Sequence, residues 1–207
     1  MVKEIRFPFE RKISPQLWFE GAGGAVGAMS VSFSSIIPYH GSWILTDASS
    51  DTIYKFSADY AMTPYMARTP SIQTMTPEVF LFPYFLSDRY YFMETVRKEM
   101  SADDFFSRRN LVLPNVQLVY DKQEDRLYQY RLYNGDYSEK RPINFHPNHR
   151  PHHNRALSSE IVFWLTLEAD DLVEAYEKGE LKGKLKEAAL GLKEEDNPVI
   201  MIVKHKK

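Results

Sequence analysis

A short phrase recurs along this chain and constrains its fold more than any other feature. Each copy has an acid, a variable residue and a bulky apolar residue, followed by aromatic residues. Two copies are Asp51-Thr52-Ile53-Tyr54-Lys55-Phe56 and Asp125-Arg126-Leu127-Tyr128-Gln129-Tyr130, and a looser one, Asp88-Arg89-Tyr90-Tyr91-Phe92, lies about 37 residues from each. The alternation inside each copy is typical of a β-strand. Repetition at this spacing predicts a supersecondary unit that is stacked several times.

The composition supports a globular β-protein. The chain has 207 residues, enough to bury the core of one domain or a small pair. Aromatic residues make up 14% of it, which favours sheet. A net charge of −2 excludes a global field that attracts nucleic acid. The basic end, Lys204-His205-Lys206-Lys207, is interpreted as a solvated tail.

The chain contains no cysteine and no clear targeting segment. The absence of cysteine excludes disulfides, thiolate nucleophiles and cysteine-based zinc sites, but it decides no compartment. Residues 21–46 carry no charged side chain, yet their serines and Pro38 argue against a spanning helix of about 20 apolar residues. Glu4, Glu10 and Glu20 interrupt any signal-peptide pattern. We therefore expect neither an export signal nor a membrane anchor in the chain as given.

The first part of the chain predicts an irregular segment and then a meander of strands. Residues 1–27 are poorly patterned and end in a run of glycine and alanine. The residues from 28 onward, to 207, are interpreted as one domain of repeated β-units. Strands are expected at 29–33, 43–46, 53–56 and 62–66. Together they make a block of about 40 residues, the size of one propeller blade.

The second block predicts strands at 79–82 and 89–96, and Pro83 between them indicates an edge strand or a bend. Residues 103–109 are expected to form a polar loop or a short helix. A hairpin follows, with strands at 116–120 and 126–133 joined across residues 121–125.

The third block contains the helical part of the chain. Residues 141–155 are rich in Pro, Asn, Arg and His, which predicts a loop, and 161–165 form an apolar strand. Thr166 is the expected cap of a helical insert around 167–191, which Gly179 interrupts. The β-branched segment 199–203 is expected to be a buried strand with a neighbour on each side.

Several of these segments resemble a family of bacterial six-bladed β-propellers, related to TolB-like and NHL-type propellers. The segments that carry the resemblance are Ser50-Asp51-Thr52-Ile53-Tyr54-Lys55, Ser87-Asp88-Arg89-Tyr90-Tyr91-Phe92, Leu132-Tyr133-Asn134-Gly135-Asp136-Tyr137, Leu167-Glu168-Ala169-Asp170-Asp171-Leu172, Lys182-Gly183-Lys184-Leu185-Lys186 and Asp196-Asn197-Pro198-Val199-Ile200. The resemblance covers roughly residues 45–207. It implies an exported protein, periplasmic or an outer-membrane lipoprotein, of a family that mostly lacks an assigned function.

The resemblance implies that this chain is the C-terminal part of a longer propeller. At about 40 residues per blade, the chain supplies about three to four blades. The expected fold class is therefore mainly β, with antiparallel propeller blades and one C-terminal helical insertion. A partial propeller leaves an open sheet flank, so we expect self-association or completion by missing N-terminal blades. The glycine-alanine stretch at 21–28 has no counterpart in the family pattern.

The sharpest candidate for metal chemistry is a histidine-rich loop, Phe145-His146-Pro147-Asn148-His149-Arg150-Pro151-His152-His153-Asn154. Neutral imidazoles are good ligands for zinc and copper. The two prolines stiffen the loop, however, the neighbouring arginines repel a cation, and no nearby carboxylate supports the ligands. We therefore interpret the loop as an exposed polar segment and assign neither a metal nor a cofactor.

Other motifs have structural interpretations. The glycine-alanine run lacks the strand, the lysine and the spacing of a phosphate-binding loop. No Gly-x-Ser-x-Gly or HExxH motif is present. The acid pairs Asp103-Asp104, Glu124-Asp125 and Asp170-Asp171 are expected in turns or at a helix start rather than across a catalytic cleft. The sequence thus singles out no catalytic residue.

Tyrosines and arginines offer recognition groups for a sugar or a peptide. The candidate recognition residues include Tyr90, Tyr91, Arg97, Tyr128, Tyr130 and Tyr133. We expect most of these side chains to pack between blades, so the sequence names no ligand-binding residue among them.

The predicted function is a non-enzymatic binding or scaffold module whose ligand is a glycan, a peptide or a partner protein. This step rests on fold analogy. The alternative is a propeller-type hydrolase or lyase that acts on a carbohydrate or a small ester. A third interpretation is a gene fragment with no independent role. No nucleic-acid partner and no membrane span are expected.

Overall fold

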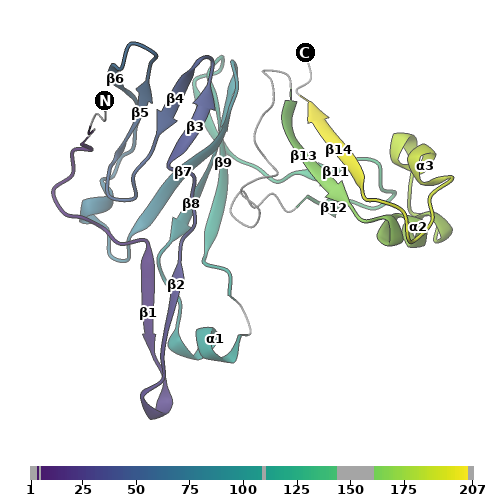
Figure 1. The fold of residues 1–207 in the computed structure, drawn as a ribbon, viewed down its shortest axis with the longest axis horizontal. Helices are drawn as coiled ribbons and strands as arrows, with labels where there is room; N and C mark the ends of the chain where they lie inside the picture. Colours follow the sequence, from purple (N-terminus) through teal and green to yellow (C-terminus); the bar gives the residue numbers. More distant parts are fainter. Residues whose placement is uncertain (1–3, 5, 109–110, 144–160, 205–207) are drawn as a thin grey trace. The chain divides into compact units, whose positions relative to one another are not determined.

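The computed structural model describes residues 4, 6–108, 111–143 and 161–204 (Figure 1). It divides into two compact units, which we treat separately. Unit 1 comprises Met1–Leu86 with Tyr90–Gln129, and unit 2 comprises Ser87–Arg89 with Tyr130–Lys207. All strand pairs in the described part of the chain are antiparallel. The prediction of a mainly β, antiparallel fold with a C-terminal helical insertion is confirmed.

The first four-stranded sheet of unit 1 is a meander. Its strands are β3 (Ile36–Tyr39), β4 (Ser42–Leu45), β5 (Thr52–Phe56) and β6 (Met62–Ala67), in the order β3-β4-β5-β6. His40 and Gly41 close the first hairpin, and both have positive φ, as the tightest hairpin turns require. The predicted meander is therefore present, but its first strand is 36–39 and not 29–33.

The second sheet of unit 1 has the order β10-β9-β8-β7. Its strands are β7 (Val79–Leu86), β8 (Tyr90–Arg97), β9 (Asn115–Asp121) and β10 (Arg126–Gln129). β7 runs through Pro83 as the end strand of this sheet in the described residues, and its register with β8 shifts between Pro83 and Phe85, so both the expected edge position and the expected irregularity are present. Proline cannot donate to a strand ladder, so a local irregularity accommodates it.

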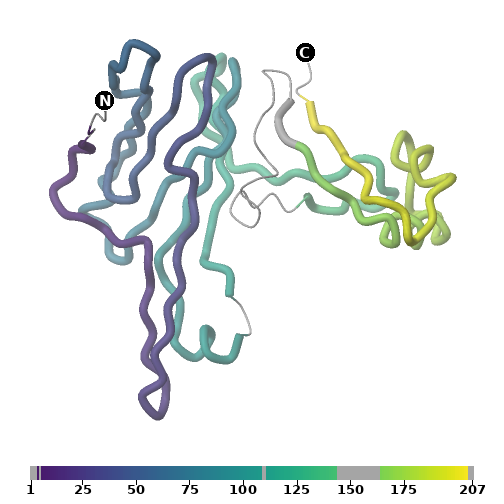
Figure 2. Tube along the Cα trace, in the orientation of Figure 1, coloured from purple at the N-terminus to yellow at the C-terminus, as the bar shows by residue number. Residues whose placement is uncertain are grey.

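A hairpin lies where the sequence predicted an irregular stretch. It consists of β1 (Gln16–Glu20) and β2 (Val26–Ser30), with the short helix η1 (Ala22–Gly24) at its tip. In Figure 2 its purple trace runs beside α1 (Ala102–Ser107). Phe105 of α1 stacks on Phe19 with the ring centroids 4.2 Å apart, and Gly27 leaves room for the Phe105 ring. The hairpin is ordered by this distant contact, which the local residue pattern does not contain.

Two hydrophobic clusters are formed by described residues of unit 1. One joins the hairpin to β7 and β8 through residues that include Leu17, Phe80 and Val96. The other joins the two four-stranded sheets to each other through Ile44, Ile53 and Leu86. Burial of these apolar side chains from both sheets is what holds the sheets together.

The repeated phrase does not mark equivalent strands. Asp51 precedes β5, the third strand of the first sheet, whereas Asp88 and Asp125 precede β8 and β10, both in the second sheet. The spacing of about 37 residues is therefore not the period of the sheets. The residue type nevertheless favours a turn that leads into a strand, and each of the three aspartates has that position.

The described part of unit 2 contains two small sheets and two helices. The sheets pair β11 (Tyr133–Asn134) with β12 (Arg141–Pro142) and β13 (Ile161–Leu167) with β14 (Val199–Lys204). The helices are α2 (Ala169–Glu177) and α3 (Gly183–Ala189), within the predicted insert. Their buried residues Leu172 and Leu185 form a core with Tyr137.

Two details of unit 2 differ from the prediction. Glu168 precedes the first turn of α2 and Thr166 belongs to β13, so Thr166 is not the helix cap. Gly179 has a φ of 69° and follows α2, as expected for a residue that ends a helix. Within the described residues β14 pairs with β13 alone, and its Ile200 side chain is 61% exposed. A second neighbour of β14 was expected and is not seen there.

Candidate functional site

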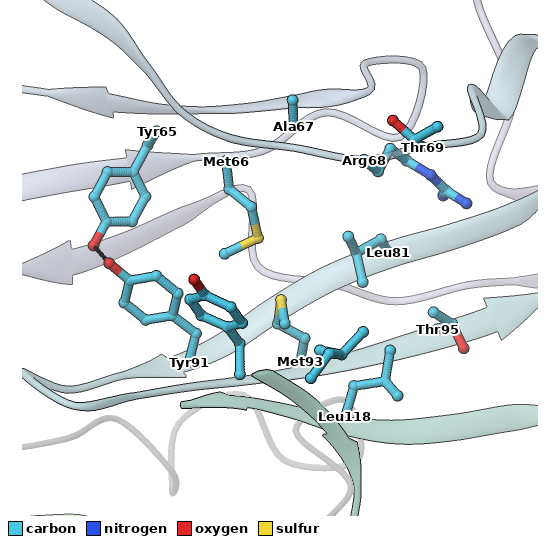
Figure 3. Close-up of a pocket in the computed structure, with 12 residues that line it drawn as sticks. Tyr65, Met66, Ala67, Arg68, Thr69, Leu81, Tyr91, Met93, Thr95 and Leu118 are labelled. Atoms are coloured by element: carbon cyan, nitrogen blue, oxygen red, sulfur yellow. Dashed lines mark hydrogen bonds between the residues drawn. The ribbon is translucent and has the colours of Figure 1, made fainter. Parts of the chain in front are cut away.

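A pocket of about 530 Å³ lies within unit 1, between β6 and one face of the second sheet (Figure 3). This volume lies in the range of small-ligand sites. The first sheet contributes the end of β6 and the residues after it, and the second sheet contributes one side of β7, β8, β9 and β10. The lining residues are Tyr65, Met66, Ala67, Arg68, Thr69, Leu81, Tyr91, Met93, Thr95, Leu118, Tyr120 and Leu127.

Strand geometry explains why these residues meet. Tyr91, Met93 and Thr95 alternate along β8, so their side chains point to the same face of the sheet. Leu118 and Tyr120 do the same on β9, and Met93 is opposite Leu118 in the register. One face of the second sheet therefore supplies most of the floor of the pocket.

Tyrosine hydroxyls form one end of the pocket. Figure 3 shows the hydroxyls of Tyr65 and Tyr91 meeting in a hydrogen bond between the two sheets. The ring of Tyr91 stacks on Tyr120, with the centroids 5.9 Å apart. Burial, followed by hydrogen bonds with Tyr39 and Tyr91, raises the pKa of Tyr65 far above its ordinary value. Tyr65 is therefore a neutral phenol near pH 7, able to donate or accept a hydrogen bond.

The middle of the pocket is apolar. Met66, Leu81, Met93 and Leu118 lie between the tyrosine pair and Arg68 in Figure 3. Methionine side chains are unbranched and polarizable, so they adapt to apolar groups of different shape. This region can accept an apolar group that a ligand would otherwise expose to water.

Arg68 lies at the other end and has a structural role. Its guanidinium donates hydrogen bonds to the main-chain carbonyls of Val79 and of Pro70, the latter at 3.2 Å. Burial lowers the pKa of Arg68, while the charge of Asp51 opposes that shift. An arginine stays protonated despite such burial, so its guanidinium keeps its donors. Through these hydrogen bonds Arg68 links the segment between the two sheets to the rim of the pocket.

Charged groups of both signs surround the tyrosine end. The Lys122 Nζ atom lies 4.9 Å from the centre of the Tyr91 ring, a cation–π distance. The Tyr120 hydroxyl donates a hydrogen bond to Asp125, which raises the pKa of Tyr120. The mouth of the pocket therefore has no single sign of charge that would select a strongly ionic ligand.

The acid pairs have the local roles that the sequence predicted. Ser101 caps α1 by accepting a hydrogen bond from the Asp104 amide at 3.0 Å, and Asp103 lies in the same first turn. Glu124 accepts a hydrogen bond from the Tyr128 hydroxyl at 2.6 Å. Asp170 and Asp171 lie in the first turn of α2. No member of these pairs lines the pocket between the sheets.

The structure brings one member of the tyrosine and arginine set, Tyr91, into the pocket. Tyr128 and Tyr133 are exposed, Tyr90 and Tyr130 are half-buried, and Arg97 forms an exposed ion pair with Glu99 at 2.6 Å. The expectation that most of this set is core is therefore wrong. Tyr128 lies on β10, an edge strand whose four residues are all exposed.

The residues that the sequence analysis missed are those from β6 and β9, above all Tyr65, Met66 and Leu118. Their alternation marked them as strand residues, but it could not show which face would line a pocket. The histidine-rich loop at His146–His153 lies outside the described residues.

Unit 2 has a smaller pocket of about 160 Å³, lined by Tyr137, Ser138, Glu139, Arg141 and Glu180. Arg141 pairs with Glu180 and lies 4.3 Å from the centre of the Tyr137 ring. Because these groups satisfy one another, little binding capacity is left for a ligand.

The described residues contain neither a metal-binding cluster of acidic and histidine side chains nor a helix able to span a membrane. Over 4, 6–108, 111–143 and 161–204, no group of three or more His, Cys, Asp or Glu residues is arranged to hold a metal ion. In that same part of the chain, none of the helices has the length and apolar character needed to cross a membrane.

Comparisons with known proteins identify no family. No family model matches the chain, and no curated protein matches it. Among solved structures, the chain is similar to a candidate exported protein of Bacteroides fragilis NCTC 9343, with a TM-score of 0.49 and 15% sequence identity. The superposition covers 91% of this chain and 57% of that protein, so this chain spans little more than half of its length.

Proposed function

We propose that this chain is a non-enzymatic binding module whose ligand enters the pocket between β6 and the second sheet. One observation carries the proposal: a cavity of about 530 Å³ with an apolar floor and a rim of tyrosine hydroxyls. An apolar cavity with a few convergent polar groups is the usual form of a ligand site. The hydroxyls would orient a ligand, and the floor would supply most of the binding free energy.

The lining favours binding over catalysis. The twelve described residues around the pocket carry no carboxylate and no imidazole. Glycoside hydrolysis uses two carboxyl groups, and ester hydrolysis uses a nucleophile with an adjacent base. The phenols of Tyr65 and Tyr91 bond to each other, and the raised pKa of Tyr65 keeps its phenol protonated, so it supplies no phenolate base near pH 7. These features support the binding module over the hydrolase or lyase alternative.

The propeller interpretation remains part of this proposal. Two consecutive four-stranded meanders that pack together through Ile44, Ile53 and Leu86 are what neighbouring propeller blades would supply. With the resemblance of residues 45–207, they support the C-terminal part of a TolB-like or NHL-type propeller. The resemblance also supports export as a periplasmic protein or lipoprotein. Recovery of the protein with the cytosol of its native cells would contradict the export proposal.

Binding of indole, a small apolar probe with one donor, tests the pocket. We expect saturable binding in ligand-observed NMR. Replacing Leu118 by Trp fills the middle of the pocket and should therefore weaken indole binding by about tenfold or more. A tenfold loss corresponds to roughly 1.4 kcal/mol of binding free energy. The control is Leu111→Trp, which adds the same side chain at an exposed position outside the pocket.

Thermal unfolding of both variants shows whether the fold is retained. Indole binding that is unchanged in Leu118→Trp would contradict the proposed site. So would equal losses in both variants, because the effect would then not depend on the pocket.

A further inference from the structure

We propose that the ligand of this pocket is an extended peptide. Its main chain pairs with the outer edge of β6, and one large apolar side chain enters the pocket. The inference rests on the proposed function and adds the chemical class of the ligand. Three features of the pocket support it. The edge of β6 forms one wall, main-chain donor and acceptor groups lie on that edge, and the Tyr91 ring already contacts Tyr120 and Lys122.

The edge of strand β6 forms one wall of the pocket. Five consecutive residues, 65–69, line the pocket. Alternate side chains of a strand point to opposite faces, so a pocket lying over one face would contact every second residue only. Contact with all five means that the pocket reaches the main chain along the edge of β6 and the residues after it. β6 is the last strand of its sheet in the described part of the molecule.

The β5–β6 ladder shows which main-chain groups face outward. The Arg68 amide donates to the Asp51 carbonyl at 3.0 Å, so these two residues form a hydrogen-bonded pair. The next pair, Thr52 and Ala67, is then of the non-bonded kind, because the two kinds alternate in antiparallel sheets. The Ser50 hydroxyl bonds to both main-chain groups of Thr52, which confirms that these groups do not reach Ala67.

The N–H and C=O of Ala67 therefore point away from β5. Ala67 is exposed and lines the pocket. Among the residues that the structure describes, no partner for its main-chain groups is found. A donor and an acceptor presented together on a strand edge are complementary to the main chain of another extended segment.

Pro64 limits docking to the second half of the strand. It lies opposite Tyr54, at another outward-facing position, so its missing N–H costs nothing to the β5–β6 ladder. It does remove a donor from the outer edge. The register shift between Ile53 and Tyr54 places Tyr65 at a bulge, between Pro64 and the second half of β6 where the peptide pairs. Bulges re-aim side chains near binding sites.

The aromatic rings favour a peptide over a glycan. Sugar recognition by stacking needs a free ring face. The Tyr91 ring stacks on Tyr120 and also carries the Lys122 ammonium group. The apolar middle, with Met66, Met93 and Leu118, suits a Leu, Met or Phe side chain of a peptide instead.

The experiment uses a library of short extended peptides with blocked ends, each with one large apolar residue. Hits are measured by fluorescence anisotropy and then rescanned with single N-methyl substitutions. We expect N-methylation at one alternating set of positions to weaken binding, because only those N–H groups face β6. Ala67→Pro should weaken binding by about tenfold through loss of its outward N–H. Ala67→Ser keeps the N–H and is the matched control.

The outcomes separate this inference from the proposed function. If indole binds but no library peptide does, the peptide assignment is overturned and the pocket stands. If neither binds, the proposed function itself fails. Peptides whose affinity ignores both N-methylation and Ala67→Pro would overturn pairing with β6. Should Ala67→Pro not fold, the N-methyl scan on the unaltered protein still decides.

Discussion

Asp51 shows how one side chain holds the connection between two sheets. Its carboxylate accepts hydrogen bonds from the Ser71 hydroxyl at 2.5 Å and from the Ile72 amide at 2.6 Å. These bonds hold the start of the short helix η2 (Ile72–Thr74), which lies between β6 and β7 in the chain. The charge of Asp51 also favours the half-buried Arg68 cation at the end of the pocket. The position of the pocket wall thus depends on a residue that does not line it.

Glu94 is a buried acid on β8, only 4% exposed, between Phe82 and Gln117 in the register. Burial raises its pKa from 4.5 to about 7. As pH rises above 4.5, the unfolded chain loses this proton first, so stability falls until about pH 7 and then levels off. The decrease in the free energy of unfolding that is due to Glu94 should be on the order of 3 kcal/mol. Urea unfolding at pH 5, 6 and 8 measures it.

Replacing Glu94 by Gln keeps the side chain neutral at every pH. We expect Glu94→Gln to be more stable than the unaltered protein at pH 8 and to lose this part of the pH dependence. Glu20→Gln, at an exposed position, should change neither result. A Glu94→Gln profile parallel to that of the unaltered protein would exclude Glu94 as the cause.

At the scale of elements, the β1–β2 hairpin depends on α1. A side chain at Gly27 would overlap the Phe105 ring, which cannot move aside freely because it stacks on Phe19. Gly27→Val should therefore lower the free energy of unfolding by about 1–3 kcal/mol, the usual cost of overpacking. Chemical denaturation measures the change.

A double variant identifies the cause. Gly27→Val should cost less in a Phe105→Ala background, because the clash is then absent. Ala28→Val changes the exposed neighbour on the opposite face of β2 and should have little effect. Equal costs of Gly27→Val in both backgrounds would contradict the packing explanation.

At the scale of the whole molecule, open sheet edges are the main consequence of the fold. The sheets are not closed into a ring in the described part of the chain, and β14 exposes Ile200 and Ile202 at 61% and 53%. Unpaired edges with apolar side chains favour association with further strands. If the chain is part of a propeller, it should self-associate as its concentration rises.

Size-exclusion chromatography with light scattering over a range of concentrations checks this expectation. The partial-propeller proposal predicts a mass above that of one chain at high concentration. A compact monomer at every concentration would argue against an incomplete ring. The indole experiment is independent of this result, because its pocket lies within unit 1.

Much of the secondary structure followed from the sequence, and the reasons are local. The meander over β4, β5 and β6 follows from period-two alternation and from turns with residues suited to positive φ, such as Gly41. The bend at Pro83 and the end of α2 at Gly179 follow from the backbone limits of these two residue types. Each signal lies within a few residues of its effect.

The candidate site could not be predicted in the same way. Tyr65 and Leu118 lie in different sheets, and their contact with one pocket depends on how those sheets pack. Alternation reveals that a strand has two faces, but it does not reveal which face meets another element. For the same reason, the residue pattern does not reveal the contact of Gly27 with Phe105, and it predicts an irregular stretch where the structure has an ordered hairpin.

The sequence by itself determined an antiparallel β-protein with a late helical insertion, because strand, turn and helix preferences act between neighbouring residues. Only the tertiary structure decided that β6 faces the second sheet across a tyrosine- and methionine-lined pocket, with Ala67 presenting its main chain. That arrangement depends on the burial of side chains far apart in the sequence. Packing between elements, and not the pattern within them, creates the site.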